Sequence, residues 1–251
     1  MLKRCLGAVA AALILVAAGM SPATAQSALD DGEKAEVEQI IRDYLLANPE
    51  LLLQVMERLE AKQQAAARDQ AERRIAENKA DLFEAEGDFV VNPDGDVPLV
   101  EFFDYQCGYC KRILPSVQRL LAEEPGVRFV FKEFPILGPV STFAAKAALA
   151  SRQQGKYLEF HNALMSYRQG LSEELVMAAA AHVGLDVERL RIDMASADVN
   201  ATIEANLRLA QAMGIRGTPT MVIGDTLVPG AINYERMVEL VAEARTNCRV
   251  C

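Results

Sequence analysis

The residues with the clearest chemistry are two cysteines that enclose two other residues, in the run Cys107-Gly108-Tyr109-Cys110. A pair of thiols at this spacing can close a disulfide and reopen it by attack of a thiolate on a disulfide sulfur. The thiolate is the reactive form, so the pKa of the attacking thiol sets its reactivity. The motif therefore indicates thiol–disulfide exchange, provided that the surrounding elements favour a thiolate.

A buried strand precedes the motif and a helix follows it. Residues 99–103 are apolar except for Glu101, as expected of a strand buried on both faces in a parallel sheet. Beyond the motif, apolar residues recur at helical spacing: Ile113, Val117, Leu120 and Leu121. Cys107 is thus predicted at a helix start, where unpaired N–H groups and the helix dipole lower a thiol pKa from about 8.5 to roughly 3.5–7.5. We predict that Cys107 is the nucleophile and that Cys110 closes the ring.

The succession of strand, Cys-x-x-Cys and helix resembles the thioredoxin fold, and Glu101-Phe102-Phe103 ahead of the motif resembles its DsbA-like branch. The resemblance implies a cis-proline that faces the thiols, for which Thr218-Pro219 occupies the matching place, with Thr218 exposing backbone to substrate. It also implies that Glu101 accepts the proton of Cys110. The alternative is that Glu101 lies at a strand end in water, since an unpartnered carboxylate inside a sheet is costly.

The remaining secondary structure agrees with that fold class. Strands are expected at residues 89–91, 127–131, 220–223 and 226–228, and helices alone at residues 141–213. The order β-α-β, helical insertion, β-β-α predicts an α/β thioredoxin fold with an all-helical insertion at residues 139–214. The catalytic domain is expected at residues 87–251.

The N-terminal third is expected to be helical but not part of the catalytic core. Residues 26–59 carry two apolar helical stripes, separated at Asn48-Pro49, and are predicted to be an oligomerisation segment. Residues 60–86 are rich in Ala, Gln, Glu, Arg and Lys and predict an exposed helical connector.

The first residues indicate export. Lys3 and Arg4 precede an apolar run, and Ala23-Thr24-Ala25 offers a cleavage site, so residues 1–25 are predicted to be a cleaved signal peptide that removes Cys5. The four remaining cysteines fit an oxidising compartment such as the periplasm. The formal net charge of −9 argues against nucleic acid as a partner.

A second pair, Cys248 and Cys251, raises the alternative of a zinc site. Zinc sites of this type separate their pairs by about 15–20 residues, whereas a whole domain intervenes here, so no metal and no cofactor are expected. The pair is interpreted as an inert terminal disulfide, with a metal-binding or redox-relay tail as the alternative. His161 and His182 are interpreted as ordinary helix residues.

Three features resemble disulfide isomerases. Gly-Tyr between the cysteines and Thr218 before Pro219 are similar to the DsbC kind, with Tyr109 offering an apolar surface to substrate, and Tyr44 to Glu50 resembles the oligomerisation region of ScsC, the suppressor-of-copper-sensitivity proteins. The resemblance implies a periplasmic homotrimer that isomerises misbridged proteins, has a membrane thiol reductase as redox partner and serves copper tolerance. The alternatives are a DsbA-like dithiol oxidase and a periplasmic copper-binding or relay protein.

Overall fold

The computed structural model describes residues 29–249, which fall into two compact units with the division between Arg58 and Leu59. Within residues 29–249, no helix combines the length and the hydropathy that crossing a membrane requires.

The first unit consists of helix α1 (Asp31–Ala47) and the beginning of helix α2 (Glu50–Glu77). The Asp30 side chain accepts a hydrogen bond from the Glu33 N–H, and the Glu33 side chain accepts one from the Asp30 N–H, which starts α1 with a capping box. The predicted break at Asn48-Pro49 is confirmed, because α1 ends just before it and α2 begins just after it.

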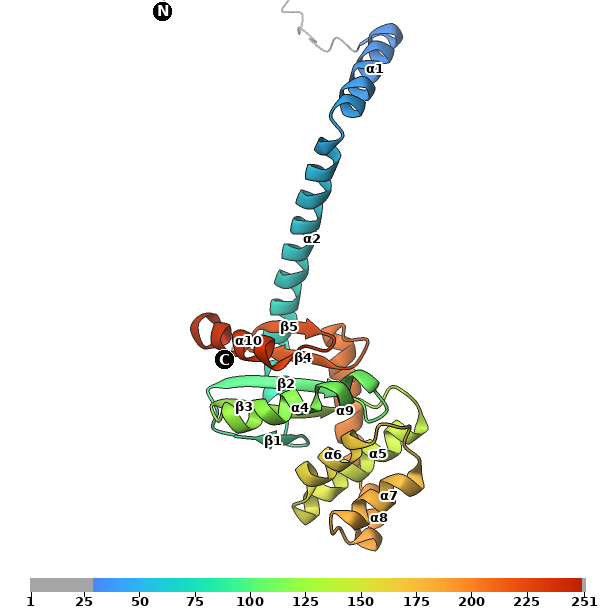
Figure 1. Cartoon of the computed structure of the whole chain (residues 1–251), viewed down its shortest axis with the longest axis vertical. Coiled ribbons are helices and arrows are strands. Elements are labelled where there is room, and N and C mark those ends of the chain that lie inside the picture. The colour runs from blue at the N-terminus through green and yellow to red at the C-terminus, as the bar shows by residue number, and fades with distance from the viewer. Residues whose placement is uncertain (1–28, 250–251) are drawn as a thin grey trace, which may run out of the picture. The chain divides into compact units, whose positions relative to one another are not determined.

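The second unit contains the sheet and the other helices (Figure 1). Its strands are β1 (Phe89–Val91), β2 (Val97–Phe103), β3 (Val127–Glu133), β4 (Thr220–Ile223) and β5 (Thr226–Pro229). Its helices are α3 (Lys79–Phe83), α4 (Gly108–Glu123), α5 (Pro139–Ser151), η1 (Arg152–Gln154), α6 (Tyr157–Ser166), α7 (Glu173–His182), α8 (Val187–Met194), α9 (Ala197–Met213) and α10 (Tyr234–Asn247).

The sheet has the strand order β1-β3-β2-β4-β5. The central strand β2 pairs in parallel with β3 and antiparallel with β4, and Glu101 lies opposite Phe131 and Met221 in these registers. All seven residues of β2 are buried, in agreement with the prediction of a strand buried on both faces. The observed element order confirms the predicted thioredoxin fold with a helical insertion.

Two apolar clusters cover the two faces of the sheet. Alternate residues of β2 belong to different clusters: Leu99 and Phe103 pack with α4 and α10, whereas Val100 and Phe102 pack on the opposite face. By the same alternation Glu101 shares the face of Leu99 and therefore points toward α4. Figure 1 shows helices α5 to α8 of the insertion gathered at one end of the sheet.

The predicted exposed connector is partly wrong, because its last part belongs to the core. Ile75 at the end of α2 is fully buried, as is Leu82 in α3, and Phe83 is almost fully buried. They pack against Leu209 and Met213 of α9. The partners of Ile75 thus lie more than 130 residues further along the chain, and the local composition gave no sign of them.

Candidate active site

Cys107 lies at the junction that the sequence predicted, between β2 and α4. It is the N-cap of α4, and its Sγ accepts a hydrogen bond from the Cys110 N–H at 3.4 Å. The thiol thus takes the place of the serine or aspartate that usually caps a helix, and the positive end of the helix dipole lies against it.

The Thr218-Pro219 segment faces this thiol. The Thr218-Pro219 peptide bond is cis, as the resemblance implied. Because β4 pairs with β2, the segment that precedes β4 is brought next to the end of β2, and the Cys107 Sγ lies 3.2 Å from the Thr218 carbonyl oxygen. Two stretches 111 residues apart in sequence therefore meet at the sulfur.

The pKa of Cys107 is lowered from 9.0 to about 5. The largest cause is a hydrogen bond from the Cys110 thiol, and the Thr218 side chain and the N–H groups of Cys110 and Tyr109 act in the same direction, whereas burial acts against them. The Thr218 carbonyl is an acceptor, so its contact with the sulfur belongs to the protonated thiol. At neutral pH the donors prevail and Cys107 is a thiolate.

Cys110 has the opposite environment. It is 2% exposed, and its pKa is raised far above the ordinary value by burial, by its hydrogen bond to Cys107 and by the charge of Glu101. The two cysteines therefore differ sharply in acidity, with a thiolate at Cys107 and a thiol at Cys110.

Glu101 lies in the middle of β2 and is 4% exposed, so the alternative of a carboxylate in water at a strand end is wrong. Among residues 29–249, no side chain or N–H group forms a hydrogen bond or an ion pair with its carboxyl group. Burial, and after it the Cys107 thiolate, raises the pKa of Glu101 from 4.5 to about 8. The buried Lys132 pairs with Asp88 and not with Glu101.

A small cavity joins Glu101 to Cys110. Its volume is about 10 Å³, and Leu114, Val117, His161 and Met165 complete its lining. A cavity of this size with polar groups on its wall has room for about one water molecule. A proton can pass through such a water between the buried thiol and the buried carboxyl group.

His161 is a part of the site that sequence reasoning missed. It is 2% exposed, lines the cavity beside Cys110, and its Nδ1 lies 3.1 Å from the Tyr105 hydroxyl. Burial lowers its pKa to about 3, so the ring is neutral. The signal was present in the sequence, because Tyr157, Phe160, His161 and Leu164 form one apolar helical face.

Behind His161 lies a buried carboxyl group. Glu133 Oε1 accepts hydrogen bonds from the Tyr105 hydroxyl at 2.9 Å and from the Tyr157 hydroxyl at 2.8 Å. Burial raises the pKa of Glu133 well above its ordinary value, against the opposing effect of the two hydroxyl hydrogen bonds. The cluster fixes the ring of Tyr105 two residues before Cys107.

Two polar side chains ahead of the motif hold the neighbouring loops. The Asp104 carboxylate accepts hydrogen bonds from the N–H groups of Ile136 and Leu137 at 2.8 and 2.9 Å. Gln106 accepts one from the Leu171 N–H at 2.9 Å. The loop before α5 and the loop between α6 and α7 are thereby fixed beside the dithiol.

The remaining predicted residues are Tyr109 and the second cysteine pair. Tyr109 is 57% exposed between the cysteines, with the Arg112 guanidinium 4.7 Å from its ring centre. Cys248 is disulfide-bonded, while Cys251, Cys5 and the predicted signal peptide lie outside the described residues. Within residues 29–249, no three His, Cys, Asp or Glu side chains are grouped so that they could hold a metal ion.

Comparison with known families gives two matches. Residues 98–242 match the family described as DSBA-like thioredoxin domain, and residues 33–66 match the copper resistance protein ScsC N-terminal domain. The first match spans both cysteines, Glu101 and Thr218-Pro219.

Individual relatives agree with this. A thioredoxin-like oxidoreductase from Silicibacter pomeroyi DSS-3 is 46% identical and covers 68% of this chain and 99% of its own, with a TM-score of 0.67. Proteus mirabilis ScsC in a transitional conformation is 30% identical and covers 87% of this chain and 98% of its own, with a TM-score of 0.64.

The curated relatives include a Na(+)/H(+) antiporter NhaA 3 from Salinispora tropica, 29% identical over 171 residues, which are 64% of this chain and 26% of the antiporter. The chain spans about a quarter to a third of the length of such antiporters.

Proposed function

Because the chain belongs to the DSBA-like thioredoxin domain family and carries an ScsC N-terminal domain, we propose that it is an exported disulfide isomerase or reductase that acts on misbridged proteins. One observation carries the proposal. Cys107, whose pKa is lowered to about 5, caps helix α4 beside the cis Thr218-Pro219 bond and next to Cys110, whose pKa is raised. This is the arrangement that attack on a substrate disulfide requires.

The reaction begins when the Cys107 thiolate attacks one sulfur of a substrate disulfide. A Cys107–substrate bond forms, the substrate S–S bond breaks, and the second substrate sulfur leaves as a thiolate. In isomerisation a different substrate thiolate attacks the substrate sulfur that is bonded to Cys107. A new substrate S–S bond forms, the bond to Cys107 breaks and Cys107 leaves as a thiolate, so no electrons are gained or lost. In reduction Cys110 attacks Cys107, and the enzyme disulfide forms as the substrate departs.

The second step requires Cys110 to lose its proton. We propose that Glu101 accepts it through the cavity that both groups line. The pKa of Glu101, about 8, lies close to neutral pH. The carboxyl group can therefore both give and take a proton at the pH of the compartment. This role makes Glu101 a proton carrier for the resolving thiol and leaves Cys107 as the attacking group.

The proposal extends to location and partners. Residues 1–25 have the pattern of a signal peptide, so we propose export to the periplasm. An isomerase must keep Cys107 reduced in an oxidising compartment, and a membrane thiol reductase is the proposed source of electrons.

We also propose that residues 26–59 hold the protein as a homotrimer. No residue of α1 is buried, and its apolar residues Ile40 and Ile41 are 60% and 54% exposed. Each such side chain stabilises an interface by about 1.5–3 kcal/mol when it is fully buried. The same apolar residues of α1 in a second and a third copy of the chain can bury these side chains, since identical chains form closed symmetric assemblies.

Light scattering on the full chain tests the assembly. Replacing Ile40 and Ile41 together by Asp should give a monomer, and the control Gln39→Asp, on the opposite side of α1, should leave a trimer. A wild-type monomer, or a trimer that survives the double replacement, contradicts the proposal.

The isomerase activity is tested by reactivation of a scrambled, fully oxidised ribonuclease with catalytic amounts of protein. We expect reactivation by the wild-type chain and none by Cys107→Ser. If the protein instead oxidises reduced ribonuclease rapidly but does not reactivate the scrambled form, it is a DsbA-like oxidase. Stoichiometric copper binding without either activity would favour the relay alternative.

A further inference from the structure

Around the dithiol lie cations that have no carboxylate partner among residues 29–249. Arg112, Arg168 and Arg216 are exposed and form no ion pair there. Lys111 is largely buried, and its Nζ donates to the Gln169 carbonyl at 3.4 Å. This arrangement is unexpected in a chain with a formal net charge of −9.

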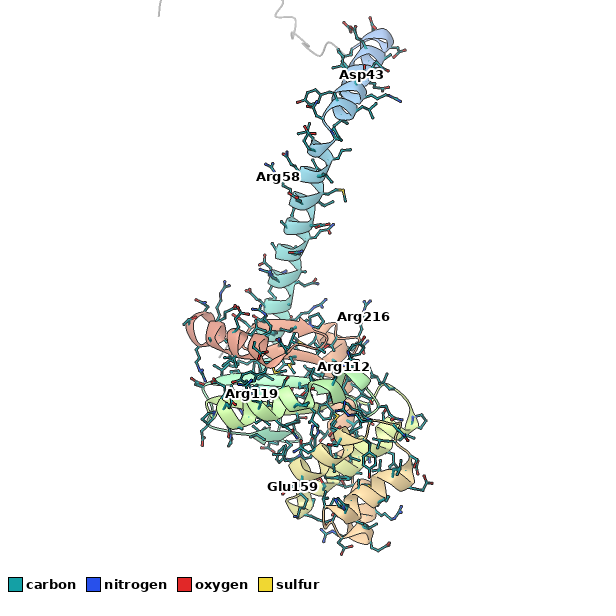
Figure 2. All side chains as sticks on the ribbon, viewed as in Figure 1. Asp43, Arg58, Arg112, Arg119, Glu159 and Arg216 are labelled. Carbon is teal, nitrogen blue, oxygen red and sulfur yellow. The ribbon has the colours of Figure 1, made fainter. Side chains whose placement is uncertain are left out.

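Their places in the fold bring these cations near Cys107. Arg112 follows the motif in α4 and lies over the Tyr109 ring. Arg168 belongs to the loop between α6 and α7, which Lys111 holds through Gln169. Arg216 stands two residues before Thr218, whose carbonyl touches the Cys107 Sγ, and its side chain projects outward in Figure 2.

Among residues 29–249, acidic partners are absent beside these three arginines, whereas six other exposed arginines of the catalytic unit are paired with Asp or Glu: Arg119, Arg189, Arg208, Arg236, Arg245 and Arg249. Arg68, Arg73 and Arg191 are also exposed without an ion pair among residues 29–249, but they lie outside the motif and its neighbouring loops. The acidic residue beside the motif, Asp104, is 1% exposed and its oxygens are taken by N–H and hydroxyl donors. Glu173 and Glu174, in the first turn of α7, form no ion pair with the cations.

Apolar side chains accompany the cations. Tyr109, Leu137 and Ile136 are 57%, 51% and 38% exposed. The N–H groups of Ile136 and Leu137 are bound by Asp104, so this apolar surface is held in place beside the thiol. A surface that combines ordered apolar side chains with unpaired arginines suits a polypeptide better than a small inorganic anion.

We propose that this face selects substrate segments that carry Asp or Glu and apolar residues beside their cysteines. The inference rests on the proposed function, because it concerns the substrates of the same thiol exchange. The arginines attract the acidic side chains, and the apolar residues contact the rest of the segment while Cys107 attacks.

The test follows one balanced reaction. Reduced protein reacts with a peptide disulfide; the peptide S–S bond breaks, the Cys107–Cys110 disulfide forms, and two peptide thiols are released. Three peptides of equal length and equal apolar content carry Asp, Ser or Lys on both sides of the cysteine. Rates are measured by rapid quenching at low and high salt with the full chain.

We expect the Asp peptide to react about tenfold faster than the Lys peptide at low salt, and the ratio to approach one at high salt. In the triple variant Arg112→Gln, Arg168→Gln, Arg216→Gln the ratio should fall close to one. The control Arg191→Gln removes another exposed, unpaired arginine, on α8, and should keep the wild-type ratio.

The possible results distinguish a failure of the acidic-substrate preference from a failure of the proposed thiol–disulfide exchange. Equal rates for all three peptides with the wild-type chain overturn the inference and leave the exchange activity standing. A triple variant that reacts more slowly with every peptide at an unchanged ratio shows that the arginines act on the thiolate, which also overturns it. No reaction with any peptide contradicts the proposed function itself.

Discussion

Replacing Glu101 by Gln should stabilise the reduced protein at neutral pH. The wild-type carboxyl group has a pKa of about 8 when folded and 4.5 ordinarily, because burial disfavours its charge. A raised carboxyl pKa means that the folded state binds the proton more tightly than the unfolded state. The corresponding stability is complete below pH 4.5 and is lost as the pH rises toward 8.

The magnitude follows from this window. Each pH unit between the two pKa values costs about 1.4 kcal/mol of folding free energy. At pH 7 the wild-type protein has therefore lost about 3 kcal/mol of folding free energy. The Glu101→Gln protein does not lose it, because glutamine has no proton to release. At pH 4.5 most of this difference between the two proteins should vanish.

Urea unfolding at several pH values measures the effect. The chain has no tryptophan, so circular dichroism is the suitable signal. Glu188→Gln, an exposed glutamate on α8 without an ion pair among the described residues, is the matched control and should follow the wild type at every pH. A difference between Glu101→Gln and the wild type that does not grow from pH 4.5 to pH 7 refutes the reasoning.

The same variant should impair turnover although it is more stable. Without a carboxyl group to accept the proton of Cys110, resolution of the mixed disulfide should slow by a factor on the order of 10². Trapping the mixed disulfide by acid quench measures its lifetime. An unchanged lifetime would show that Glu101 does not carry the proton.

Four further predictions concern the cysteines. Alkylation of Cys107 should follow a titration midpoint near pH 5, and an inflection above pH 8 would contradict the thiolate assignment. Thr218→Val removes the side chain that helps to lower the pKa of Cys107, so the alkylation midpoint should rise by a measurable fraction of a pH unit; an unchanged midpoint argues against that contact. Cys110→Ser should accumulate mixed disulfides that gel electrophoresis detects without reductant, and their absence would make Cys110 dispensable for resolution. Changing Cys248 and Cys251 to Ser should leave isomerase activity within a small factor, whereas loss of most activity would favour a relay.

The sequence predicted those parts of the fold that local patterns specify. The strand at residues 220–223 and the insertion of helices alone were visible in apolar periodicity and in glycines such as Gly214, whose φ of 73° ends α9. The position of Cys107 and Cys110 at a strand-to-helix junction followed from the apolar residues, which form a nearly continuous run before the motif and recur at helical spacing after it.

The misses share one physical cause, which is pairing over long sequence separations. Ile75, which was expected in an exposed connector, is buried against α9. His161 reaches Cys110 only because α6 packs on α4. In each case the residue type was visible in the sequence, but its partner depended on the folded arrangement.

Cys107 and Cys110 have different surroundings, exposed charges around the first and buried groups around the second, and these respond to different solution conditions, namely salt and pH. Glu101 and His161 lie inside the protein against Cys110, where dissolved salt screens little. Arg112, Arg168 and Arg216 are exposed around Cys107, where salt screens strongly. Ionic strength should therefore change the attack of Cys107 on substrate, whereas pH near the pKa of Glu101 should change the resolution by Cys110. If single-turnover kinetics showed both steps responding alike to salt, the division between an exposed recognition face and a buried proton path would be wrong.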